Sequence, residues 1–326
     1  MKVAFLDTVH PILQERLEAN GYSCHDLYST SREEILDGAL KDFEGVVIRS
    51  RLTLDARLLA ALSSLKWIAR SGSGLDNIDV EEAKARGIEI INSPEGNKDA
   101  VGEHTLGLLL MLLHKLPSGD KSVHNRQWLR EEHRGEELGA QTVGIIGYGV
   151  MGSSFAEKLS GLGCRIVAYD KYKEGFSTEN IEEVSEDEFF ELSDIVSVHV
   201  PWTSETKGMI DSKWLDRFSK PIIFLNTSRG AVVRTSDLLD AIDAGKVRSA
   251  ALDVIEFEGR SLEGLELNDV AAATLERLLK NDQILITPHV AGWSVESYFK
   301  LSSVLADKII LPVSYTHLTL PTILRV

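Results

Sequence analysis

A glycine-rich turn that follows an apolar segment limits the fold of this chain more than any other feature. Residues 142–146 are largely apolar, a G-x-G-x-x-G motif follows at 147–152, and a helical pattern runs over 153–162. The next apolar segment, 165–169, leads directly into Asp170, eighteen residues after the last glycine of the motif. A strand, a glycine turn, a helix and a second strand followed by an acid form a dinucleotide-binding unit of a parallel sheet.

The residues of this motif have separate mechanical roles. Gly147 makes the tight turn, Gly149 lets the backbone approach a pyrophosphate, and Gly152 allows the helix to pack closely on the strand. At the start of the helix, Val150 and Met151 offer backbone N–H groups and the positive end of the helix dipole to the phosphates. The motif therefore predicts a dinucleotide site, and a glycine-rich turn without a ligand is the alternative.

Asp170 bears on which dinucleotide binds. A carboxylate at this position can hydrogen-bond the ribose hydroxyls of the adenosine and would repel a 2′-phosphate. NAD is therefore the predicted cofactor. Lys171 and Lys173 follow Asp170 closely and keep NADP as the alternative.

Short apolar segments alternate with helical patterns, which is typical of parallel sheets covered on both faces. The first set of expected strands is 3–6, 45–48, 67–69 and 88–91, with helices such as 12–19 and 55–62. The second set is 142–146, 165–169, 195–199, 222–225, 249–252 and 284–286. We expect an α/β protein of two doubly wound, Rossmann-like domains with a cleft between them. We expect a substrate domain at 1–98 and 291–326, with an NAD-binding domain at 99–290 inserted between these two parts.

The charge and the cysteines exclude several classes of protein. The 326 residues include 35 Lys and Arg against 50 Asp and Glu, a net charge of −15 that disfavours nucleic acid and anionic membrane as partners. Cys24 and Cys164 are far apart and have no metal-ligand spacing, so neither a disulfide-built fold nor a metal site is expected. Apolar segments are too short for a signal peptide or a membrane span, which predicts a cytoplasmic protein.

Two further segments carry separate expectations. The helix expected over 99–116 is so apolar that it predicts contact with the other domain or with a second subunit, and a homodimer is the default. At the other end, a helix is expected over 301–310, whereas 313–326 has no periodicity. Residues 313–322 resemble the translation of a sequencing-library adapter, and we expect this tail to be an assembly artefact without function.

Polar residues follow three strands of the second set. Arg229 follows the strand 222–225, Glu258 lies shortly after the strand 249–252, and His289 follows the strand 284–286. The carboxyl ends of parallel strands meet at one edge of a sheet, where such proteins bind ligands. We therefore expect these side chains to lie close together.

The order of these motifs resembles the D-isomer-specific 2-hydroxyacid dehydrogenase family, and within it the phosphoglycerate dehydrogenases most of all. The resemblance rests on the segments 71–79, 147–152 and 199–206 and on the Arg, Glu and His above. It implies that Arg229, Glu258 and His289 are catalytic. His289 would exchange a proton with the substrate hydroxyl, Glu258 would fix its tautomer, and Arg229 would hold the substrate carboxylate.

Other positions take their roles from the same resemblance. It implies that the backbone at Ser73 and Gly74 binds the substrate carboxylate. It also implies that NAD is contacted by five further residues: Val200, Pro201, Thr206, Thr227 and Asp253. Helix caps and turns are the alternative for these positions.

Three arginines bear on the substrate. Arg49 and Arg51 follow the strand 45–48 and suit a phosphate, and Arg130 falls near a position that contacts substrate in the family. The expected reaction is oxidation of 3-phospho-D-glycerate to 3-phosphohydroxypyruvate in serine biosynthesis. If Arg49 and Arg51 only pair with surface carboxylates, a glyoxylate, hydroxypyruvate or D-lactate enzyme is the alternative. An NAD-sensing scaffold with little catalysis is the alternative from another class. Gly259 and the insert 262–281 depart from the family pattern and leave the substrate open.

Overall fold

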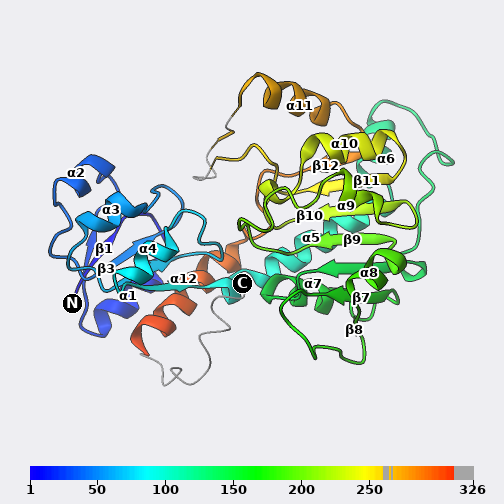
Figure 1. Cartoon of the computed structure of the whole chain (residues 1–326). Coiled ribbons are helices and arrows are strands. Elements are labelled where there is room, and N and C mark those ends of the chain that lie inside the picture. The colour runs from blue at the N-terminus through cyan, green and yellow to red at the C-terminus, as the bar shows by residue number, and fades with distance from the viewer. Residues whose placement is uncertain (260–263, 266, 312–326) are drawn as a thin grey trace. The chain divides into compact units, whose positions relative to one another are not determined.

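The computed structural model describes residues 1–259, 264–265 and 267–311, and the expectation for the tail lies outside them. The chain forms two compact units (Figure 1). Unit 1 contains Met1–Lys98 and the segment that starts at Trp293, while unit 2 contains Asp99–Glu258 and Leu265–Gly292. Each unit is built around its own parallel β-sheet, as the alternating pattern predicts.

Unit 1 has a five-stranded sheet of order β2-β1-β3-β4-β5, in which every pair is parallel. Its strands are β1 (Lys2–Phe5), β2 (Ser23–Asp26), β3 (Gly45–Ile48), β4 (Trp67–Arg70) and β5 (Glu89–Asn92). Strand β2 was not predicted from the sequence, because this edge strand reads Ser-Cys-His-Asp and is mostly exposed. An edge strand of this kind has no apolar run to detect.

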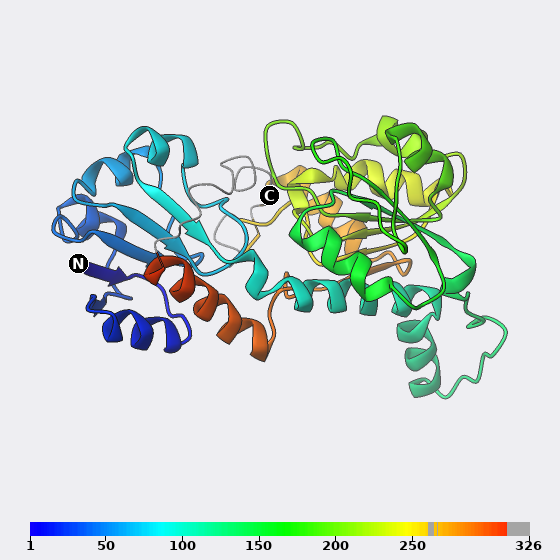
Figure 2. The ribbon, with the colours of Figure 1, turned by 90° about the horizontal axis from the view of Figure 1, so that it is seen from below.

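Helices cover both faces of the unit 1 sheet, and alternate residues of β1 show why. Val3 and Phe5 pack against α1 (Ile12–Ala19) and α12 (Val295–Ile310). Ala4 and Leu6 pack on the other face, which is covered by α2 (Arg32–Leu36), α3 (Ala56–Ala61) and α4 (Val80–Ala85). Figure 2 shows α12, in red, beside α1, although these helices lie at opposite ends of the chain.

Unit 2 has a seven-stranded parallel sheet of order β12-β11-β10-β9-β6-β7-β8. Its strands are β6 (Thr142–Ile146), β7 (Arg165–Tyr169), β8 (Glu182–Glu183), β9 (Ile195–Val198), β10 (Ile222–Asn226), β11 (Val247–Leu252) and β12 (Ile284–Ile286). The chain runs outward from β6 through β7 to β8 and then returns to β9 on the other side of β6, so the order reverses between β6 and β9. Such a switch point is where open α/β sheets bind ligands.

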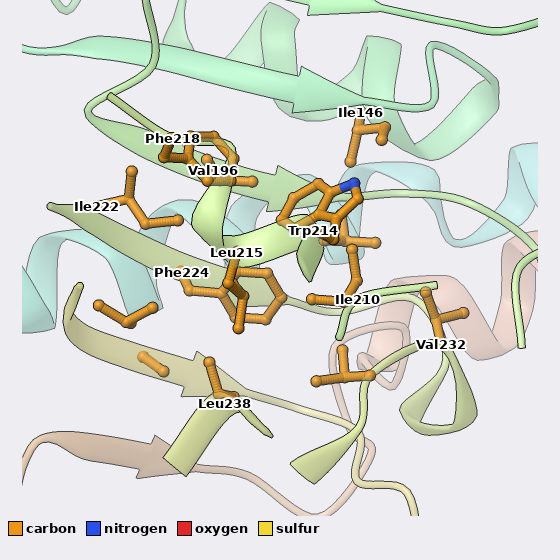
Figure 3. Close-up of a cluster of buried hydrophobic side chains, with 14 of the residues drawn as sticks. Ile146, Val196, Ile210, Trp214, Leu215, Phe218, Ile222, Phe224, Val232 and Leu238 are labelled. Carbon is orange, nitrogen blue, oxygen red and sulfur yellow. The ribbon is translucent and has the colours of Figure 1, made fainter. Parts of the chain in front are cut away.

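The faces of this sheet are covered by two groups of helices. On one face lie α5 (Lys98–Leu113) and α7 (Val150–Leu159), and on the other lie α8 (Glu186–Leu192), α9 (Ser212–Asp216) and α10 (Thr235–Asp243). Figure 3 shows the second cluster, where Trp214 and Phe218 of the α9 region pack on Phe224 of β10. This tight packing positions the strand ends that carry the polar residues.

Several helices differ from their predicted bounds. The helix expected over 99–116 ends at Leu113, and Lys115 adopts a left-handed φ of 50° before α6 (Leu116–His124) begins. The helix α7 starts at Val150 instead of 153, since Gly149 is its N-cap, and α12 starts at Val295 instead of 301. The insert 262–281 contains a helix, α11 (Asp269–Leu279), that the sequence analysis did not predict. Among the described residues, no helix has the length and apolar character needed to cross a bilayer.

Candidate active site

The glycine motif of unit 2 has the geometry that its spacing predicts. Gly147 has a φ of +89°, and a Cβ added there would lie 2.5 Å from the carbonyl oxygen of His199. A Cβ at Gly152 would lie 2.0 Å from the Gly147 oxygen, so the helix can approach the strand only without a side chain. A Cβ at Gly149 would meet no atom within 4 Å among the described residues. Two glycines are therefore required by the fold, and the third faces open space.

The first turn of α7 is the part of this loop that can bind an anion. Gly149 caps the helix without a side-chain hydrogen bond, and the N–H groups of Val150, Met151 and Gly152 have no acceptor within the helix. These donors and the helix dipole suit the pyrophosphate of a dinucleotide, so the residues fit NAD. Val200 packs against Gly147 at the end of β9, and Pro201 follows it on the surface.

Asp170 organises the same loop. Its carboxylate accepts hydrogen bonds from the backbone N–H of Tyr148 at 2.8 Å, Tyr172 at 2.9 Å and Lys173 at 3.0 Å. The ammonium of Lys173 lies over the Tyr148 ring, and Lys171 pairs with Glu205. Both lysines that suggested NADP thus have partners within unit 2, which favours the NAD interpretation of the motif.

The turn after β10 orients Arg229. Asn226 is fully buried, and its side chain donates to the Arg229 carbonyl oxygen at 3.0 Å and accepts from both the N–H and the hydroxyl of Ser228. The Arg229 guanidinium donates to the Ser228 carbonyl oxygen at 2.7 Å. Gly230 must be glycine, because a Cβ there would lie 1.9 Å from the carbonyl oxygen of Ile255. The hydrogen bonds of Asn226 and the close approach of Ile255 to Gly230 therefore fix the conformation of this turn.

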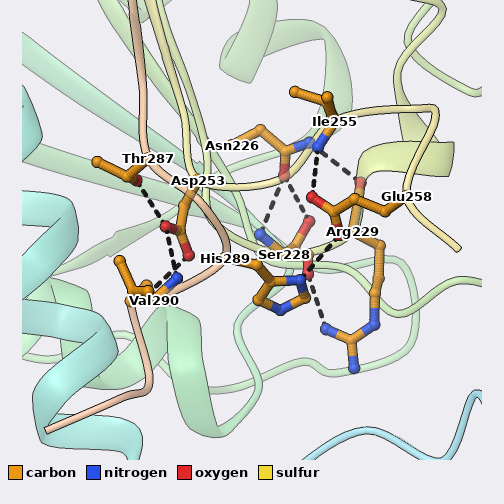
Figure 4. A network of polar contacts seen from close by, with 10 residues as sticks. Asn226, Ser228, Arg229, Asp253, Ile255, Glu258, Thr287, His289 and Val290 are labelled. Atoms are coloured by element: carbon orange, nitrogen blue, oxygen red, sulfur yellow. Dashed lines mark hydrogen bonds and ion pairs between the residues drawn. The ribbon is translucent and has the colours of Figure 1, made fainter. Parts of the chain in front are cut away.

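Glu258 and His289 form a hydrogen-bonded pair within unit 2. The Glu258 carboxylate lies 2.8 Å from His289 Nδ1, and its other oxygen accepts the N–H of Ile255 at 2.8 Å. The side chains are 18% and 25% exposed, so the pair is shielded but accessible. In Figure 4 the imidazole and the Arg229 guanidinium extend to the same side of the network. The structure thus brings Arg229, Glu258 and His289 into one cluster.

Asp253 fixes the loop that carries His289. Its buried carboxylate accepts the Thr287 hydroxyl at 2.6 Å and the N–H groups of Val290 at 2.9 Å and Ala291 at 2.8 Å (Figure 4). His289 adopts a left-handed φ of 54°, a conformation that is uncommon for residues other than glycine, and the hydrogen bonds of Asp253 to its neighbours hold the backbone there. These hydrogen bonds tie Thr287, Val290 and Ala291 together and so hold the loop that carries His289.

The remaining cofactor candidates are engaged in local contacts of unit 2. The Thr227 hydroxyl lies 2.9 Å from that of Thr105 on α5, and the Thr206 hydroxyl donates to the Pro201 carbonyl oxygen at 2.5 Å. Arg130 is exposed on the segment that follows α6.

In unit 1, Ser73 and Gly74 lie in the loop after β4. The Ser73 hydroxyl donates to Asn97 at 2.5 Å, and the Ser73 carbonyl oxygen accepts from Asn92 at 2.6 Å. Arg49 and Arg51 follow β3 at the same edge of this sheet, since β3 pairs in parallel with β4. Unit 1 therefore gathers these substrate candidates at one carboxyl edge.

Some residues that position the candidate residues were not predicted from the sequence. Asn226, Thr287 and Asn77 each hold a turn that carries a candidate residue, and His104 of α5 lies 3.1 Å from the Thr287 hydroxyl. Asn226 and Thr287 stand directly at the ends of strands, which is the signal that could have identified them. Asn77 and His104 give no such signal, because only the fold brings them to their partners.

These features define a dinucleotide-binding α/β protein, and comparisons with known proteins narrow the class. Residues 106–291 match the D-isomer specific 2-hydroxyacid dehydrogenase, NAD binding domain family. D-3-phosphoglycerate dehydrogenase of Archaeoglobus fulgidus is 34% identical over 95% of this chain and 57% of that protein. Hydroxypyruvate reductase of Thermotoga maritima is 32% identical over 83% of this chain and 85% of that protein.

A solved structure gives the same result. The D-lactate dehydrogenase of Aquifex aeolicus, complexed with NAD and lactic acid, superimposes with a TM-score of 0.79 and 26% identity over 100% of this chain and 97% of that one. The chain belongs to the D-isomer specific 2-hydroxyacid dehydrogenase family, and its unit 2 contains the NAD-binding domain. It spans about half the length of the phosphoglycerate dehydrogenases it matches.

Proposed function

We propose that the chain is an NAD-dependent oxidoreductase that interconverts a D-2-hydroxy acid and the corresponding 2-oxo acid. When bound, NAD supplies the hydride acceptor or donor for this reaction. The glycine loop and the first turn of α7 would hold its pyrophosphate, and Asp170 would lie near the adenosine ribose. The 2.8 Å contact between Glu258 and His289 carries the proposal, because it prepares an imidazole for proton transfer.

Each residue of the cluster has a definite task in this proposal. The Nδ1 of His289 is engaged by Glu258, which leaves Nε2 to take the proton of the substrate hydroxyl during oxidation and to return it during reduction. The Arg229 guanidinium would bind the substrate carboxylate through parallel hydrogen bonds. Asn226 and Asp253 would keep both groups in place through the turns that they hold.

As substrate we propose 3-phospho-D-glycerate, which is oxidised to 3-phosphohydroxypyruvate at the entry to serine biosynthesis. Arg49 supports this choice, because its guanidinium stacks on Trp293 at the carboxyl edge of the unit 1 sheet and makes no ion pair within the described part of the chain. A guanidinium of this kind suits a phosphate. The backbone at Ser73 and Gly74 would serve the carboxylate end of the substrate.

Steady-state formation of NADH at alkaline pH tests the proposal. The panel contains 3-phospho-D-glycerate, D-lactate and D-glycerate, with glyoxylate and hydroxypyruvate assayed in reverse with NADH. A preference of at least tenfold in kcat/KM for the phosphorylated acid supports the proposed substrate. Turnover of only unphosphorylated acids would favour the second candidate, a hydroxypyruvate, glyoxylate or D-lactate enzyme, which the Thermotoga relative also suggests.

The same panel addresses the third candidate, an NAD-sensing scaffold. Binding of NADH without turnover of any acid would favour the scaffold. The intact cluster of Arg229, Glu258 and His289 argues for catalysis, because a binding role alone does not need an imidazole paired with a carboxylate.

We also propose that the protein is a cytoplasmic homodimer. Met111 of α5 and Leu116 and Val123 of α6 are 41%, 53% and 50% exposed, which supports burial of this face by a second copy. The free cysteines Cys24 and Cys164 are in keeping with a reducing compartment. Light scattering of the protein and of Met111→Glu tests the dimer: a monomeric mass for the unaltered protein would exclude it.

A further inference from the structure

Two arginines of one turn in unit 1 have different surroundings. Arg49 and Arg51 follow β3, and the buried side chain of Asn77 holds their turn by donating to the carbonyl oxygens of Arg49 at 3.0 Å and Leu52 at 2.9 Å. The Arg49 N–H donates to the carboxylate of Asp7 at 2.5 Å. The backbone of the turn is therefore rigid, and the two side chains depart from fixed positions.

The guanidinium of Arg51 is committed to the protein. It donates to the carbonyl oxygen of Leu6 through Nε at 3.1 Å and Nη2 at 2.7 Å, and to that of Thr30 through Nη1 at 3.1 Å. Its Nε also lies 3.4 Å from Asp7, whose carboxylate is 9% exposed. Arg51 thus neutralises the buried Asp7 and joins the ends of β1 and β3, which makes it a structural residue.

The charge of the Arg49 guanidinium is not balanced by an ion pair among the described residues. The side chain of Arg49 makes one hydrogen bond among the described residues, a long one of 3.4 Å to the carbonyl oxygen of Thr8. Its guanidinium carbon lies 4.4 Å from the centre of the Trp293 ring, the geometry of a cation–π contact. Because Asp7 is already balanced by Arg51, the positive charge of Arg49 remains available to an anion.

Trp293 is itself held in place within unit 1. It directly precedes Ser294, which caps α12 through a reciprocal pair of hydrogen bonds with Ser297. Its ring packs edge-on against Tyr298, at 5.9 Å between centroids, and Tyr298 packs in turn against His10 at 5.4 Å. Trp293 is nevertheless 53% exposed, so part of its indole ring is accessible to solvent. A half-exposed indole supported in this way provides a fixed surface for a guanidinium.

We propose that Trp293 is a positioning residue that holds the Arg49 guanidinium for the second anionic group of the substrate, a phosphate on the carbon distant from the carboxylate. The inference rests on the proposed function and adds a specificity-determining pair to it. An unsupported arginine side chain would lose much rotamer freedom on binding a phosphate, whereas stacking on Trp293 restricts it beforehand. The pair therefore lowers KM for phosphorylated acids and does not affect the proton transfer at His289.

The experiment is a double-mutant cycle on the full chain, with Trp293→Leu, Arg49→Ala and the two combined. For 3-phospho-D-glycerate we expect KM to rise about tenfold in Trp293→Leu and about a hundredfold in Arg49→Ala, with kcat changed less than threefold. In the double variant the loss of Trp293 should add little, because the tryptophan acts through Arg49. KM for unphosphorylated D-glycerate should change less than twofold in all variants.

Two controls separate positioning from folding. Trp293→Phe keeps an aromatic face and should restore most of the affinity that Trp293→Leu loses. Phe299→Leu alters the neighbouring ring that contacts His10, at 5.2 Å, but not Arg49, and should leave KM unchanged. Circular dichroism and the KM for NAD should match those of the unaltered protein in every variant.

The outcomes distinguish this inference from the function on which it rests. A KM for 3-phospho-D-glycerate that is the same in Trp293→Leu and the unaltered protein overturns the role of Trp293 and leaves the proposed substrate standing. Equal losses for phosphorylated and unphosphorylated acids also overturn it, because the effect would then not concern the phosphate. Absence of turnover of 3-phospho-D-glycerate by the unaltered protein overturns the proposed substrate and this inference together.

Discussion

The carboxyl edges of the two sheets are built on different principles. At the edge of unit 2, the polar side chains of Asn226, Asp253 and Glu258 have hydrogen-bond partners within the protein. At the edge of unit 1, the Arg51 guanidinium also has hydrogen-bond partners within the protein. The Arg49 guanidinium instead stacks on the Trp293 ring, and no ion pair with a described residue balances its charge. The side chains at the unit 2 edge are therefore fixed before a ligand binds, whereas the unit 1 edge presents a cation that can bind an anion.

The difference separates reaction type from substrate choice. A group that transfers a proton must be held within a few tenths of an ångström, and buried hydrogen bonds achieve this. A group that recognises an anion needs charge and access more than a complete set of partners. Changes at the unit 2 edge should therefore affect turnover and stability, and changes at the unit 1 edge should affect affinity for particular acids.

The largest expected effect is at His289. In His289→Asn the side chain tolerates the left-handed backbone but cannot exchange the proton, so kcat should fall by about 10² to 10⁴ for every substrate. Steady-state rates measure this, and fluorescence titration with NADH serves as the control, since the cofactor affinity should not change. A kcat within tenfold of the unaltered protein would mean that another group carries the proton.

Asp253 tests whether the unit 2 edge is prearranged. In Asp253→Asn an amide replaces a buried carboxylate that accepts the N–H groups of Val290 and Ala291, so the free energy of unfolding should fall by about 3 kcal/mol. Urea denaturation measures the loss. The exposed Asp120 provides the matched control, and Asp120→Asn should change stability by less than about 0.5 kcal/mol. Equal stability of both variants would contradict the structural role of Asp253.

Two variants of the glycine motif should have different effects, one on the stability of unit 2 and the other on the affinity for NAD. Gly152→Ala forces a methyl group against the Gly147 carbonyl oxygen and should destabilise unit 2 by about 2 to 3 kcal/mol. Gly149→Ala meets no neighbour and should leave the stability unchanged, but it should raise KM for NAD about tenfold, because the methyl group occupies space that the pyrophosphate needs. Thermal unfolding and NAD titration measure the two effects, and an unchanged KM for NAD in Gly149→Ala would exclude this mode of binding.

A smaller effect should follow from acid. Burial lowers the pKa of His199 to about 3, and its Nδ1 has no partner among the described residues. Because the unfolded chain binds a proton near pH 6.5 and the folded chain does not, stability should decrease as the pH falls below about 6.5. The loss from this group should reach about 2 kcal/mol at pH 5.

Unfolding by urea at pH 7.5 and pH 5, on the unaltered protein and on His199→Gln, isolates that contribution. The variant lacks the titrating group, so its stability should depend less on pH by about the same 2 kcal/mol. Identical pH dependence of the two proteins would show that His199 is not the source.

Much of the fold could be predicted because apolar runs identify buried strands. The strands β3, β6, β7 and β12 have the predicted bounds, since each is an apolar run with polar or glycine neighbours. The strand β2 and the helix α11 were missed, because an exposed edge strand lacks such a run and the helix lies in an acidic, Ala-rich insert. The interpretation of Arg51 as a phosphate ligand loses support, because its guanidinium donates to the carbonyl oxygens of Leu6 and Thr30. These partners are distant from Arg51 in sequence, so the contacts could not be predicted from it.

The sequence by itself determined the parallel α/β architecture, the glycine turn and the residue types Arg, Glu and His at strand ends. It could do so because these features depend on local spacing and on alternation along the chain. Only the tertiary structure decided that Glu258 lies against His289, that Asp253 holds the loop of that histidine, and that Arg49 rather than Arg51 keeps its charge. Those contacts join residues from separate strands and helices, and their energies depend on burial and distance, which no local pattern contains.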